Sequence, residues 1–168
     1  MDVNRTTLAC HPEAFEAIIG LKVADFDTLV AEITPAHAAA ELIRKARPDR
    51  KRKIGGGMRQ RLSLANQVLA TLISTRYGAR WEVGFFLGVS WDTISRAAVR
   101  LKPILADSAA ANALMPLSMS ERQERLIRAS RCVPQHGGYL RLLGYRSDIW
   151  IDDAGVLWPL NRVGVLAA

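Results

Sequence analysis

Apolar residues recur at helical spacing along the first 47 residues, which predicts an α-helical N-terminal unit. "HPEAFEAIIG" places Pro12 at a first helical position and Gly20 as a stop. "VADFDTLVAEI" places four apolar side chains on one helix face: Phe26, Leu29, Val30 and Ile33. Thr34-Pro35 is expected to start a third helix, which runs through "AHAAAELIRKA" and is ended by Pro48.

Two further helices are predicted after a segment that shows no periodicity. Ser63 is the expected N-cap of "LANQVLATLISTRYG" and Gly78 is its stop. This helix carries a broad apolar stripe: Leu64, Val68, Leu69, Leu72 and Ile73. "DSAAANALMP" is weakly helical, whereas "SMSERQERLIRASRCV" predicts a helix capped by Ser118 or Ser120 with Glu121 in its first turn. The pattern then changes, because "DIWIDDAGVLWPL" alternates around "DDAG" and predicts a hairpin of two short strands.

The stretch "RWEVGFFLGVSWDTISRAAVRL", residues 80–101, holds two short helical patterns joined at "LGVS". Val83 and Leu87 lie four apart on the first pattern, and Ile94 and Ala97 lie three apart on the second. The second pattern runs on past residue 101, where Pro103 is expected to kink or restart the helix.

The residues at the joint favour a sharp corner between the two helices. Gly84 is small where the second helix would cross closest, and Gly88 allows the left-handed backbone of a tight turn. Val89 would plug the corner, and Ser90 would cap the second helix. This combination predicts a helix-turn-helix, in which the second helix enters the DNA major groove by its N-terminal end. The alternative is an αα-corner within an ordinary helical protein.

Charge strengthens the DNA-binding interpretation through its placement. Between residues 44 and 61 there are nine Lys or Arg against one acid, Asp49, so this segment carries +8 and the remainder of the chain −1. Three consecutive glycines and the absence of periodicity predict a linker or arm at 48–61. Phosphate neutralisation by such an arm supplies affinity that does not depend on sequence. The alternative is a solvated linker.

The predicted DNA contacts come from the arm and from the second helix: Arg50, Lys51, Arg52, Lys53, Arg59, Arg61, Ser90, Trp91, Asp92, Thr93, Ser95, Arg96 and Arg100. Two interpretations of Trp91 stay open, a contact with a thymine methyl or the sugar-phosphate backbone, and a fold back over the first helix to fill core. Arg96 and Arg100 are expected on phosphates, with base contact by Arg96 as a further option and solvated surface as the alternative.

Other chemistry finds little support in the sequence. His11, His37 and His136 are scattered, with no carboxylate or cysteine at ligand spacing, so we expect no metal site and no cofactor. "IGGGMR" lacks the Lys-Ser/Thr of a phosphate-binding loop. Cys10 and Cys132 are expected to be reduced thiols. The chain shows neither an apolar run of membrane-spanning length nor a signal-peptide core, which predicts a cytoplasmic, nucleoid-associated protein.

From residue 21 to 105 the order and spacing of motifs resemble a known family. "LKVADFDTLVAEI", the basic glycine-containing linker and "RLSLANQVLATLISTRYGARWEVGFFLGVSWDTISRAAVRLKPIL" look like the N-terminal helix-turn-helix domain of bacterial insertion-sequence transposases of the DDE superfamily. The resemblance implies recognition of the terminal inverted repeats of such an element. It also implies that an RNase H-like catalytic domain follows, whose first strand ends in a catalytic acid.

Asp152, in "DIWIDDAGVLWPLNRVG", falls at the position of that first acid, and Asn161-Arg162 resembles what trails it. The glycine-threonine of the family's phrase is replaced by Asp153-Ala154-Gly155. Only 16 residues follow Asp152, and Asp153 is the one acid among them. Two-metal phosphoryl chemistry needs several carboxylates. We therefore interpret Asp152 as a turn residue or remnant and expect no enzymatic activity.

Together these observations predict a mainly α fold, a helix-turn-helix helical domain with a short C-terminal β-hairpin. The expected units are an N-terminal helical unit, a basic linker, a helix-turn-helix domain and a C-terminal helix with hairpin: 1–47, 48–61, 62–115 and 116–168. The predicted function is sequence-specific binding of double-stranded DNA by a transposase-derived protein, which binds element ends or acts as a domesticated regulator. A homodimer on paired half-sites would multiply specificity. The alternative is a protein-interaction module or inhibitor that acts on a transposase or another partner.

Overall fold

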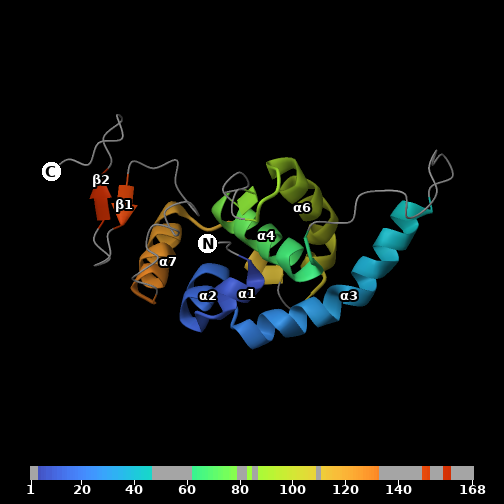
Figure 1. The fold of residues 1–168 in the computed structure, drawn as a ribbon, viewed down its shortest axis with the longest axis horizontal. Coiled ribbons are helices and arrows are strands. Elements are labelled where there is room, and N and C mark those ends of the chain that lie inside the picture. The colour runs from blue at the N-terminus through green and yellow to red at the C-terminus, as the bar shows by residue number, and fades with distance from the viewer. Residues whose placement is uncertain are drawn as a thin grey trace.

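The computed structural model describes residues 4–46, 62–78, 83–84, 87–108, 111–132, 149–151 and 157–159. The fold is mainly helical (Figure 1), and its elements follow the chain in this order: α1 (Arg5–Ala9), α2 (Pro12–Ile19), α3 (Val23–Lys45), α4 (Leu64–Tyr77), α6 (Trp91–Ala106), the 3₁₀ helix η1 (Ala111–Leu114), α7 (Met119–Cys132), β1 (Ile149–Ile151) and β2 (Leu157–Pro159). Among these helices, none has both the length and the apolar character that crossing a membrane requires.

The helix boundaries predicted around α2 are confirmed. Pro12 stands at its N-terminus, and the chain leaves the helix at Gly20, where φ is +79°. The apolar face predicted for the next helix is also found, because Phe26, Leu29 and Ile33 are buried. The ring of Phe26 meets that of Phe15 from α2 edge to face, with 5.3 Å between the ring centroids.

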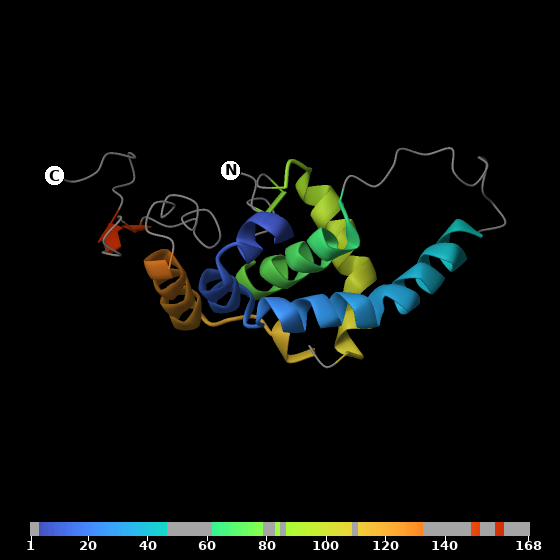
Figure 2. The ribbon, with the colours of Figure 1, turned by 60° about the horizontal axis from the view of Figure 1, so that its bottom comes forward.

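The predicted start of a new helix at Thr34-Pro35 is wrong. One helix, α3, runs from Val23 to Lys45 with Pro35 inside it. An internal proline removes one backbone hydrogen bond, and here the hydroxyl of Thr34 bonds back to the Val30 carbonyl at 2.6 Å. The alanine-rich run that follows favours continuation of the helix. α3 bends along its length, as helices with internal prolines do, and its C-terminal part projects beyond the other helices (Figures 1 and 2).

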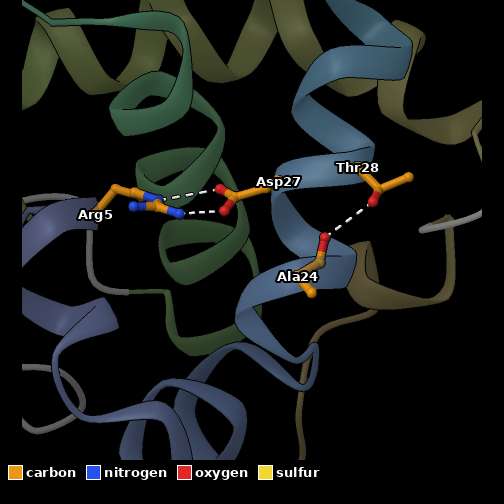
Figure 3. Close-up of polar contacts among 4 residues, drawn as sticks. All are labelled: Arg5, Ala24, Asp27 and Thr28. Atoms are coloured by element: carbon orange, nitrogen blue, oxygen red, sulfur yellow. Dashed lines mark hydrogen bonds and ion pairs between the residues drawn. The ribbon is translucent and has the colours of Figure 1, made fainter.

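Polar contacts join α1 to the helices beside it. The guanidinium of Arg5 forms a two-pronged ion pair with Asp27 of α3 (Figure 3), and its Nε donates to Asp27 Oδ1 at 3.0 Å. The residue after Asp27 bonds within α3, where Thr28 Oγ1 donates to the Ala24 carbonyl one turn earlier at 2.9 Å. The backbone N–H of Arg5 donates to Asn66 Oδ1 of α4 at 2.8 Å. The short first helix is therefore tied to both α3 and α4.

α4 forms the centre of the helical assembly. Its predicted limits are confirmed, since the Ser63 hydroxyl accepts from the Asn66 N–H at 3.3 Å and the helix ends at Gly78. It contacts α1, α2, α3, α6 and η1 and lies between them in Figure 1. Its apolar stripe is buried, and so are four polar side chains of the same helix: Gln67, Thr71, Ser74 and Arg76.

Arginines fasten the C-terminal ends of α2 and α4. Arg76 Nη1 donates to the Ala113 carbonyl at 3.1 Å, and Arg122 Nη1 of α7 donates to the Tyr77 carbonyl at 2.9 Å. Arg125 Nη1, also of α7, donates to the Ala17 carbonyl of α2 at 3.2 Å. Carbonyls in the last turn of a helix lack helical partners and attract cations. The arginines of α7 therefore provide hydrogen-bond donors for carbonyls at the C-terminal ends of α2 and α4.

The segment from residue 111 to 132 matches the helical sequence pattern. η1 occupies part of the weakly helical "DSAAANALMP". α7 is capped by Ser118 in a capping box: its hydroxyl accepts from the Glu121 N–H at 3.3 Å, and the Glu121 carboxylate accepts from the Ser118 N–H at 2.8 Å. The Glu121 carboxylate also accepts from the Ser118 hydroxyl at 2.7 Å, and this bond, together with the one from the Ser118 N–H, lowers the pKa of Glu121. β1 and β2 pair antiparallel, with Trp150 opposite Trp158.

The helices on either side of the basic segment share one core. A single cluster of buried apolar side chains joins α2, α3, α4, α6, η1 and α7. Its largest fully buried members come from separate stretches of the chain: Phe15, Phe26, Leu69, Leu72, Ile94 and Leu101. α2 and α7, far apart in sequence, pack directly on each other, as both views show (Figures 1 and 2). This shared core holds α6 in place.

Candidate nucleic-acid interface

The joint before α6 has the backbone of a helix end followed by a sharp turn. The Leu87 N–H donates to the Val83 carbonyl at 3.1 Å, as in one turn of α-helix. The Val89 N–H then donates to the Gly84 carbonyl at 2.9 Å, and Gly88 has φ of +62°. A hydrogen bond from an N–H to the carbonyl five residues earlier, closed around a left-handed glycine, is the Schellman motif that ends a helix. The left-handed turn predicted at Gly88 is confirmed.

Gly84 lies against the backbone of the turn and of the first residue of α6. A Cβ atom at this position would stand 2.7 Å from the Val89 carbonyl oxygen and 3.2 Å from the Trp91 nitrogen. Both of these are backbone atoms, which cannot rotate away as the end of a side chain can. The prediction that the second helix crosses closest at Gly84 is confirmed. Val89 is half-buried and packs against the core, as a residue plugging the corner should.

α6 begins with a hydroxyl cap. Ser90 Oγ accepts from the Thr93 N–H at 3.3 Å and lies 3.1 Å from Thr93 Oγ1, which confirms Ser90 as the N-cap. Asp92 stands in the first turn, where a negative charge interacts favourably with the helix dipole. Ser90 and Thr93 are therefore engaged in starting the helix. The helix continues through Pro103 to Ala106.

α6 has a buried face and, opposite it, an exposed one. The residues of the buried face are Ile94, Ala97, Ala98, Leu101 and Leu105. At 100° per residue, the opposite side carries Asp92, Arg96, Val99 and Pro103, which we call the outer face of α6. Arg96 Nη2 pairs with Asp92 Oδ2 at 2.6 Å, and the Arg96 side chain is 74% exposed. An exposed pair of this kind contributes little to stability, so Arg96 can exchange Asp92 for another anion at low cost.

Trp91 flanks the outer face at the N-terminal end of α6. Its side chain is 53% exposed, so it does not fold back into the core. At this exposure Trp91 is not a core residue, so that interpretation is wrong. The indole stands in solvent beside the first turn of the helix.

Two other predicted residues of α6 lie away from the outer face. The hydroxyl of Ser95 is buried and has no hydrogen-bond partner within the described ranges. Arg100 is half-buried, and its charge acts on two side chains of α3, Glu41 and His37. Arg100 therefore lies on the flank of α6 that meets α3, where it is placed to support the packing of the two helices.

A charged cluster connects α3 to this flank. Glu41 is buried and accepts two hydrogen bonds from Arg44, at 3.0 and 2.7 Å. These bonds, together with the nearby charges of Arg44 and Arg100, lower the pKa of Glu41. Burial, with the charges of Arg100 and Lys45, lowers the pKa of His37. The cluster fixes the middle of α6 against α3.

The remaining predicted residues fall outside the described part of the chain. These are the arm side chains Arg50, Lys51, Arg52, Lys53, Arg59 and Arg61, and the remnant candidate Asp152. Within the described ranges, no group of three or more His, Cys, Asp or Glu side chains is placed to hold a metal ion. The structure thus gathers Ser90, Trp91, Asp92 and Arg96 at the exposed N-terminal half of α6.

Sequence reasoning missed Val99, which lies on the outer face beside Arg96 and is 74% exposed. A signal was present, because the spacing of Ile94, Ala97 and Leu101 fixes the buried side of the helix and leaves Val99 opposite to it.

Comparisons of the chain with known protein families, with curated proteins and with solved structures give no match in any of the three.

Proposed function

We propose that the chain binds double-stranded DNA sequence-specifically, with α6 in the major groove and the basic segment on phosphates. The observation that carries the proposal is the corner from Gly84 to Ser90, which joins a helix end to an N-capped helix whose outer face is open. The major groove accepts a recognition helix only if its outer side is not covered by the rest of the protein. Here Trp91 and Arg96 are both exposed.

Charge supports the same proposal. The segment from residue 44 to 61 carries +8, and its described beginning, Arg44 and Lys45, forms the last turn of α3. α3 packs on α6, so the basic segment begins at the end of a helix that contacts the proposed recognition helix. A polyanion that lies along α6 would then be within reach of both.

The proposed biological setting follows the resemblance noted in the sequence. A transposase-type DNA-binding domain would bind the ends of an insertion element, and a domesticated descendant would bind regulatory or architectural sites in the nucleoid. No catalytic role is proposed for the chain. We expect two copies on paired half-sites, because one recognition helix covers few base pairs. The stoichiometry of the purified complex, measured by light scattering, tests this last point.

The central experiment is binding to random-sequence duplex DNA across a salt series. The arm variant has Arg50, Lys51, Arg52 and Lys53 replaced by glutamine. We expect the affinity of the wild type to fall steeply with salt, and the slope of log K against log salt to become shallower by about 0.9 for each phosphate that the arm no longer neutralises. Arg96→Ala should reduce the slope by about one if Arg96 contacts phosphate, or reduce sequence preference if it contacts a base.

The matched control for Arg96→Ala is Arg128→Ala, which removes the same charge from the exposed surface of α7. It should leave the salt slope and the affinity close to those of the wild type. The proposal is wrong if the wild type binds no duplex at low salt. It is also wrong if Arg128→Ala and Arg96→Ala weaken binding equally, because binding would then reflect net charge alone.

A protein-interaction module is the second candidate, and one observation favours it. On the projecting part of α3, Leu42 and Ile43 are 68% and 75% exposed. Exposed apolar side chains on a projecting helix are typical of surfaces that pack on another protein. This function predicts that charge reversal in the basic segment leaves activity intact, whereas Leu42→Ser with Ile43→Ser abolishes it. The salt series above separates the two candidates.

A further inference from the structure

Val99 presents an apolar side chain to solvent at the centre of the outer face of α6. The residue is 74% exposed, although it stands in the middle of a long helix. Valine forms helices less readily than alanine, so neither helix propensity nor core packing favours it at this position. Its neighbours along the outer face, Asp92 and Arg96, are charged. An apolar group at this place offers a partner that lies along the outer face one apolar contact between charged groups.

The distance between Val99 and Arg96 along α6 can be compared with the spacing of base pairs in DNA. Three residues of α-helix advance about 4.5 Å along the axis, whereas successive base pairs of B-DNA are about 3.4 Å apart. Both side chains project from the same side of α6. The backbone positions of Arg96 and Val99 are therefore separated by a distance of one to two base-pair steps.

We infer that Val99 contacts the C5-methyl group of a thymine in the major groove, within one or two base pairs of the position contacted by Arg96. The inference rests on the proposed function and adds to it the recognition of one thymine in the bound DNA. The base edges of the major groove display hydrogen-bonding groups and a single methyl, that of thymine. A valine can neither donate nor accept a hydrogen bond, so the thymine methyl is the group that its side chain can recognise.

Charge favours DNA over an apolar protein surface as the occupant of this face. Val99 is bordered by Arg96, and the basic segment leaves from α3, the helix that packs beside α6. A protein partner that covered the outer face would have to bury Asp92 and Arg96 together with Val99, at a substantial desolvation penalty. In a DNA groove both charged groups can stay hydrated while the valine methyls meet the thymine methyl.

The test uses the full chain and a duplex selected from a random-sequence pool. Each thymine of the selected duplex is replaced in turn by deoxyuridine, which lacks only the C5-methyl, and the Kd is measured for wild type and for Val99→Ala. We expect one position at which the replacement weakens wild-type binding about fourfold, as for one buried methyl. Val99→Ala should weaken binding to the thymine duplex similarly and should be insensitive to the replacement at that position.

Two results overturn the inference. In the first, the wild type selects a sequence, but every deoxyuridine replacement affects wild type and Val99→Ala equally. In the second, duplexes bind without sequence enrichment. In both cases the chain still binds DNA, so the failure of the inference is distinct from a failure to bind duplex. If no duplex is retained even at low salt, the proposed function itself has failed. Circular dichroism and thermal unfolding show whether Val99→Ala keeps the fold, which its exposure leads us to expect.

Discussion

α4 and α6 are two neighbouring helices of similar length, and they distribute polarity in opposite ways. Both begin with a serine N-cap, Ser63 and Ser90, whose hydroxyls accept the same kind of backbone hydrogen bond. α4 buries polar side chains, including Thr71 at 0% exposure, whereas α6 leaves Val99 and Trp91 in solvent. Polarity alone would therefore predict the wrong exposure for each of these side chains.

The reason for this difference is the position of each helix in the assembly. α4 is surrounded by other helices, and two of its buried hydroxyls bond to its own carbonyls: Thr71 Oγ1 donates to the Gln67 carbonyl at 2.8 Å, and Ser74 Oγ donates to the Thr71 carbonyl at 3.2 Å. α6 leaves its outer face uncovered. Its exposed apolar groups gain nothing from the fold, so they are the ones whose presence an external partner would explain.

The largest expected contrast is between truncations of one core residue on α4 and one exposed residue on α6. Leu72→Ala should lower the free energy of unfolding by about 2–5 kcal/mol, because Leu72 is fully buried and a cavity would remain. Val99→Ala should change it by no more than about 0.5 kcal/mol. Chemical denaturation of both variants measures the two values. Equal losses would show that Val99 is packed in the folded protein and would remove the contrast.

The next effect concerns the buried tyrosine at the end of α4 and appears at alkaline pH. Tyr77 donates to the Ile18 carbonyl at 3.0 Å, and burial raises its pKa to about 12. Ionisation is easier in the unfolded chain, near the ordinary value of about 10. The stabilisation is therefore fully present below pH 10 and is lost as the pH rises from about 10 to about 12. Over this range the free energy of unfolding should fall by about 2–3 kcal/mol.

Tyr77→Phe provides the control for this alkaline loss. It should be about 1 kcal/mol less stable at neutral pH, because the Ile18 carbonyl loses its hydrogen bond. Above pH 10 it should lose less stability than the wild type, so the two curves of unfolding free energy against pH converge. Parallel curves would mean that Tyr77 ionises equally easily in the folded and the unfolded chain.

The smallest effect sharpens the comparison at the two N-caps. Ser63→Ala and Ser90→Ala should each lower the free energy of unfolding by about 1 kcal/mol, since each removes one cap hydrogen bond. Their consequences for DNA should differ. Ser90→Ala loosens the first turn of the proposed recognition helix and should weaken duplex binding, whereas Ser63→Ala should not. Thermal unfolding and duplex-binding curves of both variants test this difference. An equal loss of affinity in the two variants would contradict the prediction.

Much of the local structure was predictable from the sequence. Caps and stops such as Pro12, Gly20, Ser63 and Ser118 act through atoms within a few residues, so their effects can be deduced without the fold. The corner at Gly84 and Gly88 was predictable for the same reason. The helix start predicted at Thr34-Pro35 is wrong, because the absence of one backbone hydrogen bond does not outweigh the helix-forming residues on both sides of Pro35.

The sequence by itself determined where most helices begin and end, which residues form the corner and where positive charge is concentrated. Only the tertiary structure decided which helix faces are covered. It buried Thr71 and Arg76, exposed Trp91 and Val99, and turned Arg100 toward α3. The physical reason is that capping and turn geometry depend on near neighbours, whereas burial depends on contacts between segments such as α2 and α7 that lie far apart in the chain.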